Sequence, residues 1–345
     1  MLKHEAFMRE AIELSRNGFP APNPHVGCVI VKDDQIVGRG FCDHDGADHA
    51  EVVALAEAGE RAKGATAYVT LEPCNHFGQT PPCSQALAKS GIARVFVATR
   101  DRNPIAKGGV EYLKEIGIEV EVGLCAFETA EANTQFLFAM AEKRPMVTVK
   151  AGMTMDGRIA LANGESKWIT NDASRLDAMR LRAEVGCVMI GRATAEQDKA
   201  RLNVRGVHVA NQPLRVVIDP RSVLDHTLPI FDDTAPTLHL TNQSGIDSPQ
   251  DILHRIWERE RTGVLIEGGP TTTAHFLKAG LVDQVVLYVA PRIFGEGKSW
   301  IGTFGLPDLN AAPLFELVHS QVIESDVKLT YHSRNLAKFL ASYKL

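Results

Sequence analysis

The sequence predicts an α/β protein made of two domains. Its 345 residues are enough for about two domains of ordinary size. Short apolar strands alternate with helices through the first half, which is typical of a three-layer α/β/α unit. A boundary is expected at Lys143-Arg144-Pro145, because a fresh strand starts directly after it. We therefore expect one domain at 1–145 and a second at 146–345.

The elements of the first half follow one another regularly. Helices are expected at 3–17, 49–59, 83–90, 108–116 and 126–142, and strands at 26–31, 35–41, 65–71, 94–99 and 118–122. Ligands of such sheets gather beyond the carboxyl ends of the strands. Four polar residues are placed to reach that crevice: Asn23, Glu72, Asp101 and Asn103.

The second half has the same alternation and then ends in antiparallel strands. Strands are expected at 146–151, 185–190, 214–218, 237–240, 263–266, 284–290, 314–322 and 327–332, and helices at 172–184, 249–261 and 272–279. No G-x-G-x-x-G follows a predicted strand, so a Rossmann domain is not supported. The pair Gly268-Gly269 could bind a phosphate through backbone N–H groups, or it could be an ordinary turn. The arginines of helix 172–184 could likewise meet a phosphate or form a solvated basic face.

Composition argues against several classes of protein. With 45% apolar residues the chain can build ordinary hydrophobic cores. Its net charge is −5 and it has no basic stripe, which argues against a nucleic-acid partner. No apolar run approaches the roughly 18 residues that span a bilayer, and the N-terminal helix lacks the apolar core of a signal peptide. Six cysteines in a chain of this length are not a disulfide framework. We expect a cytoplasmic protein without nucleic-acid or membrane partners.

Three residues of the first half form a ligand set that suits zinc. His49 would supply an imidazole, and Cys74 and Cys83 would supply two thiols. Three protein ligands leave a fourth position for water, which is the arrangement of a catalytic zinc. His-x-Glu followed by Pro-Cys and a second Cys is the signature of zinc-dependent nucleobase deaminases, although eight residues rather than two separate the cysteines here.

Glu51 is the candidate proton carrier beside this zinc. It lies two residues after His49, and on one helix those side chains point about 200° apart. Both can face one centre only if that centre lies beyond the helix end. Two other interpretations stay open. The cysteines could be separate buried thiols with His49 as a helix cap, or the zinc could be structural, with His44 or His76 as its fourth ligand.

Long motifs occur in both halves of the chain. They are NPHVGCVIV (23–31), HAEV (49–52), TLEPCNHFGQTPPC (70–83), MDGRIA (155–160), GESKWIT (164–170) and EGGPT (267–271). Together they resemble the bifunctional deaminase/reductase family of riboflavin biosynthesis, in that family's order and over nearly the whole chain. The wide spacing of the two cysteines is the spacing that this family uses.

The resemblance implies two folds and two reactions. The first half would have a cytidine-deaminase-like α/β/α fold, and the second a dihydrofolate-reductase-like α/β fold that binds a dinucleotide without the Rossmann fingerprint. A zinc-dependent deamination of 2,5-diamino-6-(5-phosphoribosylamino)pyrimidin-4-one would precede reduction of the product's ribose to a ribityl chain by NADPH. The expected partners are these pyrimidine ribosyl phosphates and further copies of the chain in a homo-oligomer.

The resemblance also implies the residues of both sites. In the deaminase half, His49, Cys74 and Cys83 would bind zinc, Glu51 would carry protons, and substrate would be held by Asn23, His76, Asp101 and Asn103. In the reductase half, the substrate positions would be Lys150, Ser166, Arg182, Leu202, Arg205 and Glu267. The cofactor positions would be Gly152, Trp168, Thr170, Thr194, Asp198, Gly268, Gly269, Pro270 and Thr271. His76 could instead be a plain loop histidine, and Lys150 a paired structural charge.

Three stretches depart from the family pattern. Gln79 stands where a basic residue is usual, so one phosphate contact of the deaminase site is in doubt. GRGFC (38–42) stands where Gly-Glu-Gly-aromatic-His is common, but the metal ligands are untouched and activity is expected to survive. Residues 333–345 run past the matched region. Their apolar stripe is expected to be a docking or oligomer contact rather than a catalytic element, and it consists of Leu336, Phe339, Leu340 and Tyr343.

Overall fold

A computed structural model describes residues 2–77 and 81–344, and the chain forms two compact units. One unit is Met1–Glu142 together with Phe339–Leu345, and the other is Lys143–Lys338. The sequence placed all of 333–345 in the second domain. In the structure the end of this segment belongs to the first unit, because the ring of Phe339 packs edge-on against Phe138 with 5.4 Å between the ring centroids.

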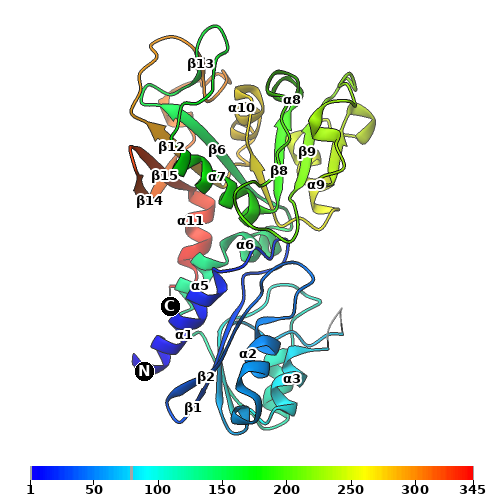
Figure 1. Cartoon of the computed structure of the whole chain (residues 1–345), viewed down its shortest axis with the longest axis vertical. Coiled ribbons are helices and arrows are strands. Elements are labelled where there is room, and N and C mark those ends of the chain that lie inside the picture. The colour runs from blue at the N-terminus through cyan, green and yellow to red at the C-terminus, as the bar shows by residue number, and fades with distance from the viewer. Residues whose placement is uncertain (1, 78–80, 345) are drawn as a thin grey trace. The chain divides into compact units, whose positions relative to one another are not determined.

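The first unit is built on a five-stranded mixed sheet with the order β2-β1-β3-β4-β5 (Figure 1). Its strands are β1 (Gly27–Lys32), β2 (Gln35–Phe41), β3 (Thr66–Leu71), β4 (Arg94–Thr99) and β5 (Glu119–Val122). β1 runs antiparallel to both of its neighbours, whereas β3, β4 and β5 are parallel. The carboxyl ends of β3 and β4 therefore meet at the same edge, where ligands of such sheets bind.

Helices cover both faces of this sheet, as the three-layer prediction requires. α1 (Leu2–Ser15) and α5 (Ala126–Ala132) lie on one face, and α2 (Ala50–Ala58), η1 (Gly59–Ala62), α3 (Cys83–Lys89) and α4 (Gly109–Glu115) lie on the other (Figure 1). Side chains of each strand alternate between the two cores, because successive residues of a strand point to opposite faces. Val29 packs with α1, for example, and Ile30 with α2.

The predicted helix 126–142 is wrong in one respect, since it is two helices, α5 and α6 (Thr134–Glu142). Asn133 separates them, and its side-chain oxygen accepts a hydrogen bond from the backbone N–H of His25 at 3.1 Å. This tertiary bond gives Asn133 a partner outside the helix, which is the competition that disfavours asparagine in helix interiors.

The stretch GRGFC keeps the two glycines that let α2 approach β2. A Cβ on Gly38 would lie 2.1 Å from the carbonyl oxygen of Ala54, and one on Gly40 would lie 2.1 Å from that of Ala50. Arg39, between them, points away from this contact and pairs with Glu10 on α1. The unusual arginine is therefore compatible with the packing of the helix that carries Glu51.

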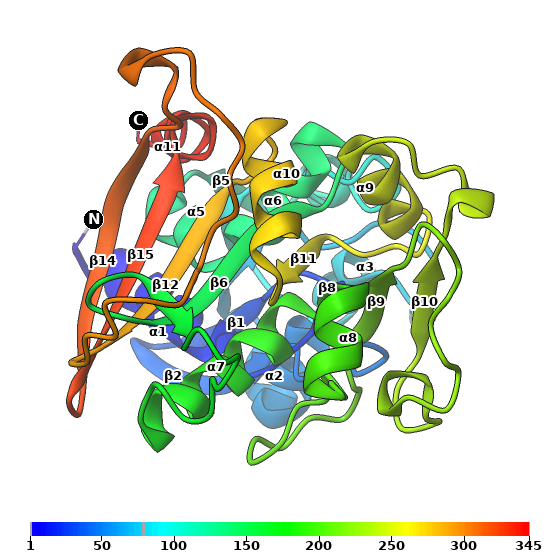
Figure 2. The ribbon, with the colours of Figure 1, turned by 90° about the horizontal axis from the view of Figure 1, so that it is seen from above.

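The second unit is built on an eight-stranded sheet with the order β10-β9-β8-β11-β6-β12-β15-β14 (Figure 2). Its strands are β6 (Met146–Thr154), β8 (Cys187–Gly191), β9 (Leu214–Ile218), β10 (Thr237–Leu240), β11 (Gly263–Ile266), β12 (Gln284–Ala290), β14 (Phe315–Ile323) and β15 (Asp326–Ser333). The first six strands in this order are parallel, and β15 and β14 add an antiparallel end.

Helices again cover both faces of the parallel part. α7 (Asp172–Val185) and α8 (Arg192–Asp198) pack on one face, and α9 (Pro249–Trp257) and α10 (Pro270–Lys278) on the other. The sequence did not predict the short helix α8. Smaller elements are β7 (Arg158–Ala160), β13 (Lys298–Ser299), η2 (Pro229–Phe231), η3 (Asn242–Ser244), η4 (Leu309–Ala311) and α11 (Arg334–Ala341). No helix in the described part of the chain has the length and apolarity needed to cross a membrane.

Candidate functional site

The first candidate site lies at the N-terminal end of α2. His49 is the N-cap of this helix and has an extended backbone with φ −67° and ψ 151°. Glu51 lies in the first turn, is only 3% exposed, and sits beside the Cys83 thiol. Because His49 precedes the first helical residue, its ring can approach the same thiol as Glu51. His49 and Glu51 therefore do face one point beyond the end of the helix, as their spacing in the sequence required.

The cysteines reach this centre from two other elements. Cys74 follows β3, and Cys83 opens α3 after Pro82. The Nδ1 atom of His49 lies 3.1 Å from Cys83 Sγ and 3.6 Å from Cys74 Sγ, and all three donor atoms lie within 4.8 Å of one another. A tetrahedral zinc separates such ligand atoms by about 3.3–3.8 Å, so one imidazole and two sulfurs at these distances fit that ion.

No fourth protein ligand joins the group among residues 2–77 and 81–344. His44 instead pairs through Nδ1 with Asp43 at 2.9 Å, and His76 is not part of the cluster. A closed structural zinc site would need another ligand, so the arrangement of the described residues is that of an open, catalytic site.

Burial and hydrogen bonding set the protonation of this centre. Burial raises the pKa of Glu51 to about 7, because the carboxylate loses its hydration. The hydrogen bond from the Cys83 thiol, helped by His49 against the effect of burial, lowers the pKa of Cys74. A thiolate is the form of cysteine that binds a metal.

Glu72 has a different place from the one that the sequence indicated. Its buried carboxylate accepts hydrogen bonds from the backbone N–H groups of Asp101, Gly108 and Val110 at 3.2, 3.0 and 3.3 Å. It therefore faces the protein backbone and ties the segment after β4 to the end of β3. We call residues 101–108 the 101–108 loop.

The four predicted substrate residues of this unit occupy different environments. Asp101 accepts a hydrogen bond from the backbone N–H of Asn103 at 2.7 Å, and burial raises the pKa of Asp101 to about 6. Asn23 is exposed and donates to Asp45 at 2.9 Å. The Nδ1 atom of His76 is buried and has no hydrogen-bond partner in the described part of the chain. Gln79 lies outside the described residues.

The second unit contains a buried triad of charged residues. Glu267, directly after β11, accepts hydrogen bonds from Arg182 Nε and Nη2 at 2.5 and 3.0 Å and from Lys150 Nζ at 3.2 Å. Burial works to raise the pKa of Glu267, but the charges of Arg182 and Lys150 outweigh it and lower that pKa to about 2. Arg182 also donates to the carbonyl of Asn203 at 2.9 Å. Lys150 thus has a partner among the predicted substrate residues.

Two glycines let the loop after β11 pack closely against α8 and the end of β8. A Cβ on Gly268 would lie 3.0 Å from Thr194 Cγ2, and one on Gly269, whose φ is +58°, would lie 3.3 Å from Thr194 Oγ1. Gly269 is the N-cap of α10 and Pro270 its first residue. Gly268 and Gly269 thus lie close to Thr194, and the helix N-terminus beside them favours anions such as phosphates. These residues fit a dinucleotide phosphate.

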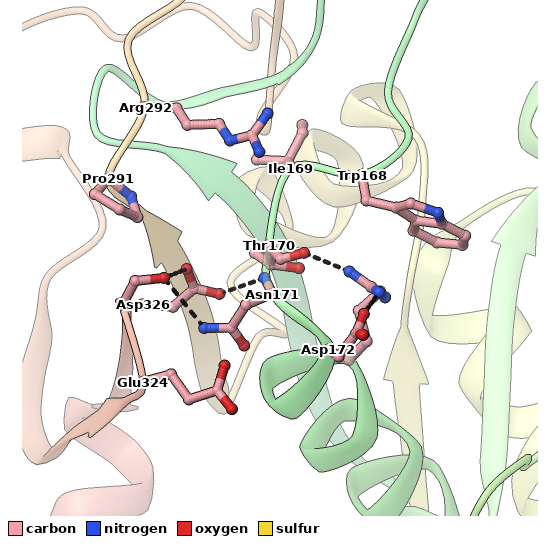
Figure 3. Close-up of a pocket in the computed structure, with 11 residues that line it drawn as sticks. Trp168, Ile169, Thr170, Asn171, Asp172, Pro291, Arg292, Glu324 and Asp326 are labelled. Carbon is pink, nitrogen blue, oxygen red and sulfur yellow. Dashed lines mark hydrogen bonds and ion pairs between the residues drawn. The ribbon is translucent and has the colours of Figure 1, made fainter.

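A cavity of about 570 Å³ adjoins two other predicted cofactor residues, Trp168 and Thr170 (Figure 3). The guanidinium of Arg175 lies 4.5 Å from the centre of the Trp168 ring and donates to the Thr170 carbonyl at 2.5 Å. On the opposite wall, the backbone N–H of Asn171 donates to Asp326 at 2.8 Å. The segment 168–171 is therefore held from both sides.

The remaining predicted residues differ in their burial. Leu202 is buried, with a φ of +57°, Ser166 is half-buried, and three are exposed: Asp198, Arg205 and Thr271. Sequence reasoning missed Asn203 and did not single out Arg175 among the arginines of its helix. The arginines of α7 had been noticed, but only their environments separate exposed Arg180 from Arg175 and Arg182, which have partners. Asn203 contributes a backbone carbonyl, for which a sequence carries no signal.

Comparison with known proteins decides the family. Residues 145–329 match the family described as RibD C-terminal domain, and residues 1–99 match the cytidine and deoxycytidylate deaminase zinc-binding region. The riboflavin biosynthesis protein RibD of Aquifex aeolicus is 43% identical over 87% of this chain and 90% of its own length. This chain belongs to the RibD family. RibD of Escherichia coli is 36% identical over 95% of this chain and 99% of its own.

Solved RibD structures share the fold of the whole chain. Acinetobacter baumannii RibD, form 1, has a TM-score of 0.88 at 39% identity and covers 96% of this chain and 99% of its own. A Thermotoga maritima protein, with a TM-score of 0.87 at 34% identity and the same coverage, is described as a diaminohydroxyphosphoribosylaminopyrimidine deaminase/5-amino-6-(5-phosphoribosylamino)uracil reductase. Membership of the RibD family confirms a zinc-binding deaminase half, a reductase half that uses NADPH, and a role in riboflavin biosynthesis.

Proposed function

We propose that the first unit deaminates 2,5-diamino-6-(5-phosphoribosylamino)pyrimidin-4-one and that the second unit reduces the ribose of the product with NADPH. The deaminase proposal rests on one observation. His49, Cys74 and Cys83 lie together at the end of the helix that carries buried Glu51. The T. maritima relative is named for this pair of reactions, which supports the choice of substrate.

In the deaminase, different side chains would bind the metal and transfer protons. His49, Cys74 and Cys83 would hold zinc, which when bound would lower the pKa of water and so supply hydroxide as the nucleophile for the ring carbon that carries the amine. Glu51 would take the proton of that water and pass it to the ring nitrogen and the departing ammonia. Burial suits Glu51 to this task, because a carboxyl with a pKa of about 7 can both accept and donate a proton near neutral pH.

The substrate would be oriented by polar groups around this centre. The Asp101 carboxyl and the amides of Asn23 and Asn103 supply both donors and acceptors for the pyrimidine and ribose. His76, whose buried Nδ1 has no partner among the described residues, would complete that unmet hydrogen bond on the ligand.

In the reductase, NADPH would, when bound, supply the hydride that C1 of the ribose accepts. The N-terminus of α10 and the backbone of Gly268 and Gly269 would bind the cofactor's phosphates, with Trp168 and Thr170 beside its other end. Glu267 stays ionised at neutral pH and would accept hydrogen bonds from ribose hydroxyls. The Lys150 ammonium would donate a proton to the ring oxygen released as the ribose opens, whereas Arg182 cannot be deprotonated in a protein.

A coupled assay on zinc-loaded protein tests this proposal. The diaminopyrimidinone ribosyl phosphate and NADPH are supplied together, and ammonia release and NADPH oxidation are followed in the same sample. Both signals are expected, and both are expected to stop in Glu51→Ala, because the reductase then receives no deaminated substrate. The variant should regain NADPH oxidation when the deaminated compound is added directly. Ammonia release without NADPH oxidation in the unmodified protein would refute the reductase assignment.

We also propose that the chain forms a homo-oligomer in the cytoplasm. Support for self-association comes from edge strand β14, where Leu317, Val318 and Val322 are 55%, 48% and 73% exposed, since a long apolar edge is normally covered by a partner. Support for a reducing compartment comes from the six cysteines, all of which are unpaired. Sedimentation of the protein and of Val322→Lys tests the first point, and cell fractionation tests the second.

A further inference from the structure

The C-terminal residues Phe339–Lys344, which we call the tail, pack onto the first unit. Phe339 meets Phe138 edge-on with ring centroids 5.4 Å apart, and Leu340 is only 5% exposed. At the end of the tail, the Lys344 ammonium lies 4.3 Å from the centre of the Phe127 ring. Phe339 of the apolar stripe that the sequence showed thus contacts α6, and Lys344 contacts α5.

The tail also contacts one residue of the 101–108 loop. The Nε atom of Arg102 donates a hydrogen bond to the Tyr343 hydroxyl at 2.9 Å. The same guanidinium lies 5.4 Å from the centre of the Phe339 ring and 5.6 Å from that of Tyr343, within the range of cation–π attraction. Two aromatic rings and a hydroxyl therefore hold a side chain that is otherwise exposed to solvent.

Arg102 stands between the two loop residues that would bind the substrate, Asp101 and Asn103. The loop is tied on its inner side, where Glu72 accepts the backbone N–H groups of Asp101 and Gly108. Within the loop, Asp101 and Asn103 cap the backbone N–H groups two residues further on. Arg102 is the attachment on the outer side. A shift of its backbone would move both neighbours, because one peptide bond joins it to each.

We propose that the tail positions the 101–108 loop of the deaminase through Arg102. Phe339 and Tyr343 are positioning residues, since they act on the substrate through Arg102 and not by contact with it. This inference rests on the proposed deaminase function, which places Asp101 and Asn103 at the substrate. The C-terminal residues, which follow the last strand of the reductase sheet, thereby form part of the deaminase.

Conservative variants of the full chain test the inference. Tyr343→Phe removes only the hydroxyl, Phe339→Leu keeps an apolar side chain without the ring, and Arg102→Gln removes the cation. Each should raise KM for the diaminopyrimidinone ribosyl phosphate by about three- to tenfold and leave kcat within about twofold, because substrate positioning changes while zinc and Glu51 do not. The matched control is Ser342→Ala, in the same tail, whose hydroxyl donates to the carbonyl of Phe339 and to no other group among the described residues.

Two further measurements separate positioning from a general loss of structure. Reduction of the deaminated compound by NADPH should be unchanged in all four variants. The double variant Arg102→Gln/Tyr343→Phe should have the KM of Arg102→Gln alone, because the hydroxyl acts only through the guanidinium. A rise of KM in Arg102→Gln but not in the two tail variants overturns the proposal, since Arg102 would then meet the substrate directly. Unchanged KM in every variant overturns it as well.

Backbone hydrogen exchange gives a readout that does not depend on activity. The amides of residues 101–108 should exchange faster in Tyr343→Phe than in the unmodified protein or in Ser342→Ala, and equal exchange would contradict the proposal. If the unmodified protein releases no ammonia from this substrate, the proposed function fails. The exchange experiment still decides whether the tail holds the loop.

Discussion

The two candidate sites are built in different ways. In the deaminase, the chemistry rests on four side chains between His49 and Cys83 whose donor atoms converge on one point. In the reductase, the site extends from Lys150 to Thr271 and consists of a charged triad, glycines that pack closely against Thr194, and a helix N-terminus. A metal centre depends on a few atoms at fixed distances, whereas a dinucleotide site depends on backbone, empty volume and balanced charge over a large area.

Removal of zinc should separate the two sites most sharply. A chelator should abolish ammonia release, because His49, Cys74 and Cys83 then hold no ion to acidify the water. NADPH oxidation should persist when the deaminated compound is supplied. Both activities are measured on the same treated sample, and added zinc is the control that should restore the first. Equal loss of both activities would mean that the sites are not independent.

The charged triad predicts a stability effect that has no counterpart at the zinc centre. Glu267→Gln keeps the shape of the side chain but leaves Lys150 and Arg182 without their buried counter-charge. The unfolding free energy of the second unit should fall by about 3–5 kcal/mol, as measured by urea denaturation. Glu316→Gln, at an exposed carboxylate of β14, is the control and should change it by less than about 0.5 kcal/mol.

The triad also has a pH signature. The pKa of Glu267 is lowered from its ordinary value of 4.5 to about 2, so the folded state favours the ionised form. This contribution to stability is fully present above pH 4.5 and is lost as the pH falls through about 2. The unmodified protein should therefore lose stability in acid more steeply than Glu267→Gln. Parallel pH profiles would show that the triad does not stabilise the fold by charge.

The loop that contains Gly268 and Gly269 predicts an effect on cofactor binding alone. In Gly268→Ala the new Cβ would lie 3.0 Å from Thr194 Cγ2 and 3.1 Å from Ile190 Cγ2, so these side chains or the loop must give way slightly. KM for NADPH should rise by about tenfold, with no change in ammonia release. Gly152→Ala, whose Cβ would meet Thr170 at an ordinary 3.4 Å, should have a smaller effect. An unchanged KM for NADPH in Gly268→Ala would remove this loop from the cofactor site.

The smallest expected effect concerns the cost of keeping Asp101 buried. The pKa of Asp101 is raised from 3.8 to about 6, so above pH 6 the ionised carboxylate destabilises the fold, and this cost disappears as the pH falls to about 4. Asp101→Asn should thus raise the melting temperature of the first unit by a few degrees at pH 8 and hardly at pH 4.5, as measured by calorimetry. Exposed Glu60→Gln is the control. A gain that does not depend on pH would contradict the role of charge.

Much of the fold could be predicted because most strands follow local patterns. β2, β4, β9, β10, β11 and β12 have the bounds that their apolar runs indicated. The break at Asn133 and the short helix α8 could not be predicted. The first depends on a bond to the backbone of His25, and the second is one short segment without a long apolar period. Local sequence cannot report either cause.

The zinc ligands could be predicted more fully than the rest of the site, because an imidazole and two thiols at this spacing rarely serve another purpose in a protein. Glu72 shows the limit of the same reasoning. It stands in the most informative motif of the chain, yet its carboxylate binds backbone N–H groups of the 101–108 loop. A polar residue at the end of a strand can contact a ligand or hold a loop, and the sequence could not distinguish these two roles for Glu72.

The sequence by itself determined the chemistry that this protein can perform. It supplies one imidazole and two thiols for a metal, Glu51 for proton transfer, and Gly268 and Gly269 for close approach of a ligand, because these properties belong to the residues themselves. Only the tertiary structure decided which of them meet. The contact between Arg102 and Tyr343 joins residues 241 positions apart, and the pKa values of Glu51 and Glu267 move in opposite directions. The contact depends on which segments the fold brings together, and each pKa depends on how deeply the group is buried and which charges lie beside it.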